Sequence, residues 1–225
     1  MNSLISDILF GFTGLISIIN PIGVAFVFYD RTAALTEEAR RLIARRIAVN
    51  AFFVLLVAFF VGAPVLRFFG ISIEALRIGG GLAVAVAAWQ MLNAPDAQTS
   101  GERDDAMRLV PELAASKAFF PLTVPLTTGP GSIATAIALA ANRGVHRLPT
   151  FLLSAVASLV ISVLVMLVIY LVYSRSARLA RYLGADGMRV ALRVSSFLLL
   201  CIGVQIILTG VEGFLAPIMG SHGAG

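Results

Sequence analysis

Six long runs of apolar residues, separated by short polar segments, are the dominant pattern in this chain. They cover residues 4–29, 47–69, 71–92, 118–141, 150–173 and 190–215. A helix needs about 20 residues to cross a hydrocarbon layer of about 30 Å, and each run is at least that long. The runs lack the alternating ten-residue pattern of a membrane barrel. The pattern predicts an all-α fold, a polytopic membrane bundle of six transmembrane helices.

The composition agrees with a membrane protein and narrows the chemistry. Of 225 residues, 59% are hydrophobic and 13% charged, and the mean hydropathy is +0.94. Cys201 is the only cysteine, so an internal disulfide and a cysteine-based metal site are excluded. His146 and His222 are far from each other and from acidic clusters, and no nucleophile and base form a pair. We expect no metal, no cofactor and no enzymatic activity.

Basic residues gather in alternate connections between the apolar runs, which predicts the orientation in the membrane. Thirteen of the 17 follow the first, third and fifth runs, namely Arg31, Arg40, Arg41, Arg45, Arg46, Arg103, Arg108, Lys117, Arg175, Arg178, Arg181, Arg189 and Arg193. This confinement argues against nucleic acid as a partner despite the net charge of +5. By the positive-inside rule we expect both termini to face outward, which in a bacterial inner membrane would be the periplasmic side.

The two halves of the chain look like inverted copies of one three-helix unit. Residues 75–80 read Ala-Leu-Arg-Ile-Gly-Gly, and residues 191–196 read Ala-Leu-Arg-Val-Ser-Ser at the start of the sixth run. With three helices per half, the second copy enters the membrane from the opposite face. We therefore expect an N-terminal repeat over residues 1–95, a polar cytoplasmic connection over 96–117 and a C-terminal repeat over 118–225. The glycines at 79–81 predict close helix packing.

The first helix of each half is interrupted near its middle by proline and glycine. Residues 20–23 read Asn-Pro-Ile-Gly, and residues 128–132 read Thr-Gly-Pro-Gly-Ser. Proline removes a backbone donor and glycine relaxes the chain, so each helix is expected to unwind over about four backbone groups and to restart at the proline. Asn20 is the expected N-cap of the restarted helix. A plain proline kink is the alternative for either break alone.

Two restarted helices aimed into the bundle would attract an anionic group, because helix N-termini carry partial positive charge. A small substrate with a carboxylate, such as an amino acid, suits that field. Thr127, Thr128 and Ser132 add hydroxyl groups around the second break. A coupling ion, H⁺ or Na⁺, and a homo-oligomeric state are left open by the sequence.

The break in the first run, together with residues 121–133, Pro-Leu-Thr-Val-Pro-Leu-Thr-Thr-Gly-Pro-Gly-Ser-Ile, resembles the MarC family over essentially the whole chain. These integral membrane proteins belong to the wider LysE-like transporter group. The resemblance implies a cytoplasmic-membrane protein with relatives that transport small neutral amino acids. It implies substrate contact at Asn20, Pro21, Gly23, Gly129, Pro130 and Gly131.

From these observations the sequence predicts a secondary transporter of small solutes, most of all neutral amino acids. It would work by alternating access at a midplane site between the two broken helices. The alternative from another class is a non-transporting membrane scaffold or regulator, in which the kinked helices serve only packing. The identity of the substrate and the direction of transport do not follow from the residues.

Overall fold

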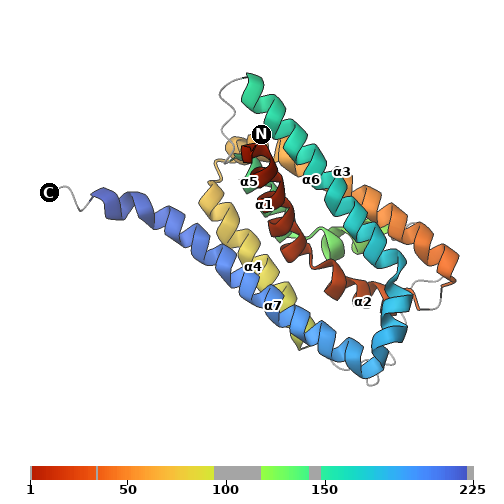
Figure 1. Cartoon of the computed structure of the whole chain (residues 1–225). Coiled ribbons are helices and arrows are strands. Elements are labelled where there is room, and N and C mark those ends of the chain that lie inside the picture. Colours follow the sequence, from red (N-terminus) through yellow and green to blue (C-terminus); the bar gives the residue numbers. More distant parts are fainter. Residues whose placement is uncertain (1, 34, 94–117, 142–147, 222–225) are drawn as a thin grey trace.

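The computed structural model describes residues 2–33, 35–93, 118–141 and 148–221 (Figure 1). Helices account for nearly all of this part of the chain, which contains no strand. They are α1 (Asn2–Ile19), α2 (Pro21–Arg31), α3 (Glu37–Phe68), α4 (Ile73–Leu92), the π-helix η2 (Phe119–Thr127), α5 (Pro130–Ala141), α6 (Leu148–Ser174) and α7 (Ser176–Ser221). The all-α prediction is therefore confirmed. The predicted connection over 96–117 lies outside the described residues.

Five helical segments are long and apolar enough to cross a membrane. They are Leu4–Arg31, Glu37–Phe68, Ile73–Leu92, Phe151–Ser174 and Asp186–Ala216. The run predicted as the fourth span, 118–141, is divided into η2 and α5, and α5 has only 12 residues. A sixth crossing built from these two pieces stays a prediction.

α3 begins well before the predicted start at residue 47. Thr36 caps it, because its hydroxyl accepts a hydrogen bond from the Ala39 amide at 3.2 Å, and Glu37 and Glu38 lie in the positively polarised first turn. The basic segment expected to be a connection is therefore helical. At 32 residues α3 is about 48 Å long, so one end extends beyond a hydrocarbon layer of about 30 Å.

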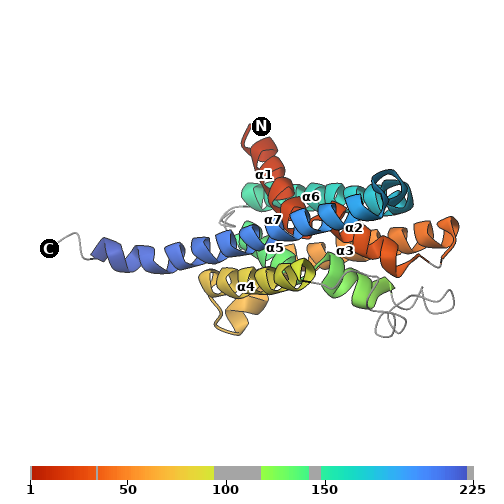
Figure 2. The ribbon, with the colours of Figure 1, turned by 90° about the horizontal axis from the view of Figure 1, so that it is seen from below.

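α7 also starts earlier than expected, two residues after the end of α6. A bend at Gly184, with φ 67° and ψ 179°, separates its first turns from the apolar run predicted from residue 190. This backbone conformation favours glycine, since a Cβ is sterically disfavoured at that φ. The bend lets the chain turn from α6 along the bundle edge, and the C-terminal part of α7 projects beyond the other helices in both views (Figures 1 and 2).

The helices form three layers, which Figure 1 shows from the side. α3 packs against α6 in one outer layer, and α4 packs along α7 in the other. The interrupted segments lie between them: α1 and α2 contact α6 and α7, whereas η2 and α5 contact α3, and α5 contacts α4. Both breaks are therefore held in the middle layer, where protein can satisfy backbone groups that hydrocarbon cannot.

Apolar packing joins the middle layer chiefly to α3 and α6. The main buried cluster draws on α1, α2, α3, η2, α5 and α6 and includes Leu15, Phe28, Leu55, Leu122 and Ile161. A separate small cluster of Val84, Ala88 and Leu199 lies between α4 and α7. The α4–α7 layer is thus attached to the rest through a smaller apolar contact.

Glycines set the spacing between α4 and α7. A Cβ on Gly81 would lie 2.8 Å from the Gly203 carbonyl oxygen, and one on Gly203 would lie 2.7 Å from the Ala85 amide nitrogen. The helices therefore touch through main-chain atoms, which only small residues allow. The close packing predicted for residues 79–81 is confirmed at Gly81, and at Gly80, where a Cβ would lie 2.5 Å from the Ala134 Cβ.

Candidate functional site

The first break is one residue wide and centres on Asn20. This residue has φ 46° and ψ 59°, a left-handed conformation that asparagine tolerates better than most residues. Its Oδ1 accepts a hydrogen bond from the Gly23 amide at 3.3 Å, and its carbonyl accepts one from the Val24 amide at 3.0 Å. The predicted N-cap is confirmed. The break is narrower than expected, because the Asn20 amide still donates to the Ile16 carbonyl at 2.9 Å.

The second break centres on Gly129, whose carbonyl oxygen accepts three hydrogen bonds. They come from the Ser132 amide at 3.1 Å, the Ile133 amide at 3.2 Å and the Ser132 hydroxyl at 2.9 Å. α5 begins at Pro130, as the sequence predicts. The Gly129 carbonyl therefore accepts from the third and fourth amides of its helix, which Asn20 bonds at the first break with its side chain and its carbonyl.

The two restarted helices expose the same position of their first turn. In each, the first residue is proline and has no N–H, and the third and fourth amides are bonded to the residue before the proline. The second amide, of Ile22 or Gly131, has no hydrogen-bond partner among the described residues. Each break thus presents one amide donor at a positively polarised helix end.

The two breaks lie at the same level, side by side. α1 contacts α5, while α2 contacts η2. Since α1 precedes its break and α5 follows the other one, the two broken segments run antiparallel, with the interruptions beside each other. The candidate site residues from the two breaks are thus brought into one region of the middle layer.

Burial differs among the predicted site residues. Asn20 and Gly129 are half-buried and Pro130 is exposed. The others are buried, namely Pro21, Gly23, Thr127, Thr128, Gly131 and Ser132. The accessible face of the region is therefore formed mainly by the residues that precede each restarted helix and by Pro130.

Threonine hydroxyls hold the segment before the second break in a π-helix, which the sequence did not lead us to expect. Thr123, Thr127 and Thr128 each donate their hydroxyl to the carbonyl five residues earlier, at 2.7, 2.8 and 3.1 Å. Residues 121 and 125 are prolines, which supply no N–H to the helix. The hydroxyls therefore add hydrogen bonds to the Ala118, Leu122 and Thr123 carbonyls, and their oxygens keep lone pairs that can accept from a ligand.

Asn50 ties this π-helix to α3, because its Nδ2 donates to the Thr123 hydroxyl oxygen at 3.4 Å. Tyr173 ties it to α6, since its hydroxyl lies 3.0 Å from the Thr127 hydroxyl. The Tyr173 ring also stacks on Phe28 of α2, with 4.9 Å between ring centroids. Tyr173 therefore touches both broken segments, and sequence reasoning missed it because nothing local marks an aromatic residue at the end of an apolar run.

Removing the Tyr173 hydroxyl should weaken this link without destroying the fold. We expect Tyr173→Phe to lower the free energy of unfolding by about 1 kcal/mol, because Thr127 keeps its bond to the Leu122 carbonyl and is not left unpaired. Thermal melting in detergent measures the change. Tyr170→Phe, on the same helix but exposed, is the control and should melt like the unsubstituted protein. Equal melting of the two variants would contradict the link.

The duplicated sequence motif also takes part, because each copy packs against the break of the other half. In α7, the Ser195 carbonyl accepts from Asn20 Nδ2 at 3.4 Å, and a Cβ on Gly23 would lie 2.9 Å from the Ser195 Cβ. In α4, Gly80 faces Ala134 and Gly131 of α5. Gly80 and Ser195 belong to the small residues that the two copies share, whereas a Cβ on Gly79 would meet nothing within 4 Å.

Comparison with known proteins shows which family the chain belongs to. The family model described as "MarC family integral membrane protein" matches residues 5–215. The chain belongs to the MarC family. Its MarC relatives include the UPF0056 inner membrane protein MarC of Salmonella typhimurium strain LT2, 32% identical over 219 residues, which are 94% of this chain and 96% of the relative. The protein of the same name from Escherichia coli strain UTI89 is 32% identical over 210 residues, 89% of this chain and 92% of that one.

No solved structure matches the chain. MarC membership agrees with the apolar helices described above, and the relatives carry "inner membrane protein" in their names. The names of these two MarC relatives do not mention a substrate.

Proposed function

We propose that this MarC family member is a secondary transporter of small solutes, chiefly neutral amino acids. It works by alternating access at a midplane site between the two breaks. One observation carries the proposal. Two helix N-termini, each with one available amide, lie side by side in the middle layer. Discontinuous helices of this kind, meeting between two halves of a chain, are typical of substrate sites in secondary transporters.

An inverted repeat, with η2 and α5 together as the sixth crossing, is part of the proposal. In such a repeat, α1–α2 corresponds to η2–α5, α3 to α6, and α4 to α7. The contacts between helices support this correspondence, because they occur in matched pairs. α4 packs on α5, and its counterpart α7 packs on α2; α3 packs on η2 and α5, and α6 packs on α1 and α2. The same explanation covers the start of both restarted helices at a proline, with the third and fourth amides bonded to the residue before it.

The chemistry of the breaks suits a zwitterion. The amides of Ile22 and Gly131 are donors at positively polarised helix ends and would bind a carboxylate. Hydroxyl oxygens of the buried threonines and Ser132 are acceptors for an ammonium group. A neutral amino acid carries both groups and leaves no net charge to be buried, which keeps the cost of transfer into the bundle low.

The orientation that we propose is supported by where the arginines lie. Arg40 and Arg41 at the start of α3 share one end of the bundle with Arg175, Arg178 and Arg181 at the α6–α7 turn. By the positive-inside rule this end faces the cytoplasm, and both termini then lie on the periplasmic side.

Counterflow in proteoliposomes tests transport directly. Vesicles preloaded with unlabelled alanine or glycine should take up the labelled amino acid with saturable kinetics, and empty vesicles should not. Imposed H⁺ and Na⁺ gradients identify the coupling ion. Asn20→Asp should reduce uptake at least about fivefold, because the added carboxylate and the substrate carboxylate, some 4 Å apart, repel by about 1–4 kcal/mol. Asn93→Asp, the same change at the exposed end of α4, is the matched control.

A panel of neutral amino acids without saturable uptake would rule out the substrate class. The competing function, a membrane scaffold, is separated by melting with ligand present. A transporter gains stability from its substrate by mass action, about 2.7 kcal/mol at 100 times the dissociation constant, whereas a scaffold does not. Asn20→Asp should lose that stabilisation as well as the uptake.

A further inference from the structure

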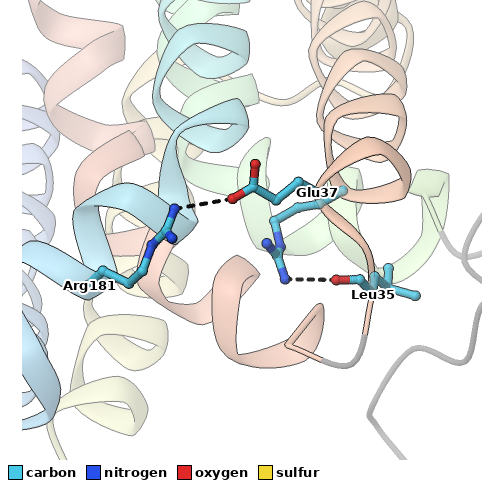
Figure 3. A network of polar contacts seen from close by, with 4 residues as sticks. Leu35, Glu37 and Arg181 are labelled. Atoms are coloured by element: carbon cyan, nitrogen blue, oxygen red, sulfur yellow. Dashed lines mark hydrogen bonds and ion pairs between the residues drawn. The ribbon is translucent and has the colours of Figure 1, made fainter.

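A polar cavity of about 290 Å³ lies at the basic end of the bundle, away from the two breaks. The start of α3, the end of α6 and the start of α7 form its walls. Its charged lining residues are Arg40, Arg41, Arg175, Arg178, Arg181 and Glu37. Five cations and one anion in one cavity give a strong local excess of positive charge. Figure 3 shows one wall, where Glu37 pairs with Arg181 at 3.1 Å across α3 and α7.

Three of the five arginines are already engaged by protein. Arg40 donates from Nη2 to the Thr32 carbonyl at 2.8 Å and to the Leu35 carbonyl at 3.1 Å, the bond drawn in Figure 3. Arg181 has its ion pair with Glu37, and Arg175 donates to the Leu171 carbonyl at 3.3 Å. Within the described part of the chain, the side chains of Arg41 and Arg178 have no ion pair or hydrogen bond, so both guanidinium groups remain to bind an anion.

The cavity continues into an apolar surface of the membrane-spanning part of α6. Tyr170 and Leu171 line the cavity and are each 36% exposed. From there exposed apolar residues follow one face of α6 at helical spacing, namely Leu171, Leu167, Val163, Leu159, Val156 and Leu152. α6 ends at Ser174 and its span at the same residue, so the arginines stand at the level where lipid headgroups meet the hydrocarbon.

We propose that this cavity binds the phosphate of an anionic phospholipid, with the acyl chains lying along the exposed face of α6. Guanidinium groups recognise phosphate through paired hydrogen bonds, and basic pockets between membrane helices commonly take phospholipid headgroups. The volume suffices for a phosphodiester and its glycerol, since a water molecule takes about 30 Å³. The adjoining apolar face favours a lipid over a free phosphate ion. The proposal does not depend on the transport function.

Thermal melting of the delipidated full-length protein in detergent provides the test. Short-chain phosphatidylglycerol should raise the melting temperature saturably, whereas short-chain phosphatidylcholine and inorganic phosphate should not. Arg41→Gln with Arg178→Gln should weaken the phosphatidylglycerol effect about 30-fold in concentration, since each interfacial arginine contributes about a factor of five. Arg45→Gln with Arg46→Gln, which removes the same charge from exposed positions of α3 outside the cavity, should leave it unchanged.

Equal stabilisation by phosphatidylcholine, equal loss in both double variants, or full stabilisation by inorganic phosphate alone would each overturn the proposal. A fluorescence measurement gives a second test that keeps all the arginines, so its result does not depend on whether the double variants fold. Trp89→Phe removes the only tryptophan, and Leu171→Trp puts a reporter beside the cavity. Phosphatidylglycerol with brominated chains should quench this reporter more than brominated phosphatidylcholine at the same mole fraction in vesicles. Equal quenching by the two lipids would contradict lipid binding at this cavity.

Discussion

Replacing Gly131 with alanine is expected to reduce amino acid counterflow by about 10- to 100-fold and to destabilise the protein by about 1–3 kcal/mol. A Cβ at this position would overlap the Val84 Cγ2 of α4 and lie 3.3 Å from the Gly80 carbonyl oxygen. Valine is held in one rotamer in a helix and cannot turn aside. The first turn of α5 must therefore move, and the Gly131 amide moves with it.

Two further variants separate this effect from a general intolerance of substitution. Gly131→Ala combined with Val84→Ala removes the overlap and should restore most of the counterflow. Gly14→Ala is the control in α1, because a Cβ there meets nothing within 4 Å and alanine is the better helix former. Undiminished counterflow in Gly131→Ala alone would show that the close approach of α5 to α4 has no part in function.

Arg40→Ala should be the most destabilising single substitution at the basic end, by about 2–4 kcal/mol, because each buried carbonyl left without a donor costs about 1–3 kcal/mol. Arg40 is 5% exposed, and besides its two carbonyl partners its Nε donates to the Thr32 hydroxyl at 3.1 Å. Its guanidinium carbon lies 5.0 Å from the centroid of the Tyr29 ring. Removing the side chain leaves the buried Thr32 and Leu35 carbonyls without this donor, so the turn between α2 and α3 loosens.

Melting temperature and limited proteolysis near Thr32 measure this loss. Arg40→Lys should recover only part of it, because an ammonium group cannot reproduce the forked geometry of the guanidinium. Arg45→Ala, exposed on the same helix, should change stability by less than about 0.5 kcal/mol. If Arg40→Ala and Arg45→Ala had the same melting temperature, the hydrogen bonds of Arg40 would not be stabilising the turn.

Local rules were enough to predict the breaks. Proline at the first position of a helix and asparagine before it are preferences of the backbone itself, so Pro21, Pro130 and the cap by Asn20 could be assigned from neighbours in the chain. The long apolar runs predicted the helices for the same reason. The candidate site is therefore defined by features that act over four or five residues.

Features that depend on distant partners could not be predicted. Asn20 bonds to Ser195, and Thr127 to Tyr173, across parts of the chain that only the packed helices bring together. The π-helix needs several threonine hydroxyls to act on carbonyls at once, which no single residue reveals. Arg40 looked like one more cation of a polar connection, although the Thr36 cap extends α3 and buries it.

The glycine contact between α4 and α7 has a mechanical consequence. Where main chains already touch at Gly81 and Gly203, the two helices cannot approach further, and separating them would open a void that lipid tails are too large to fill. We therefore expect α4 and α7 to move together as one rigid body during any rearrangement. Sliding would then occur along the less apolar contact with the central segments, where the chain is interrupted by one residue at Asn20 and by two at Thr128 and Gly129.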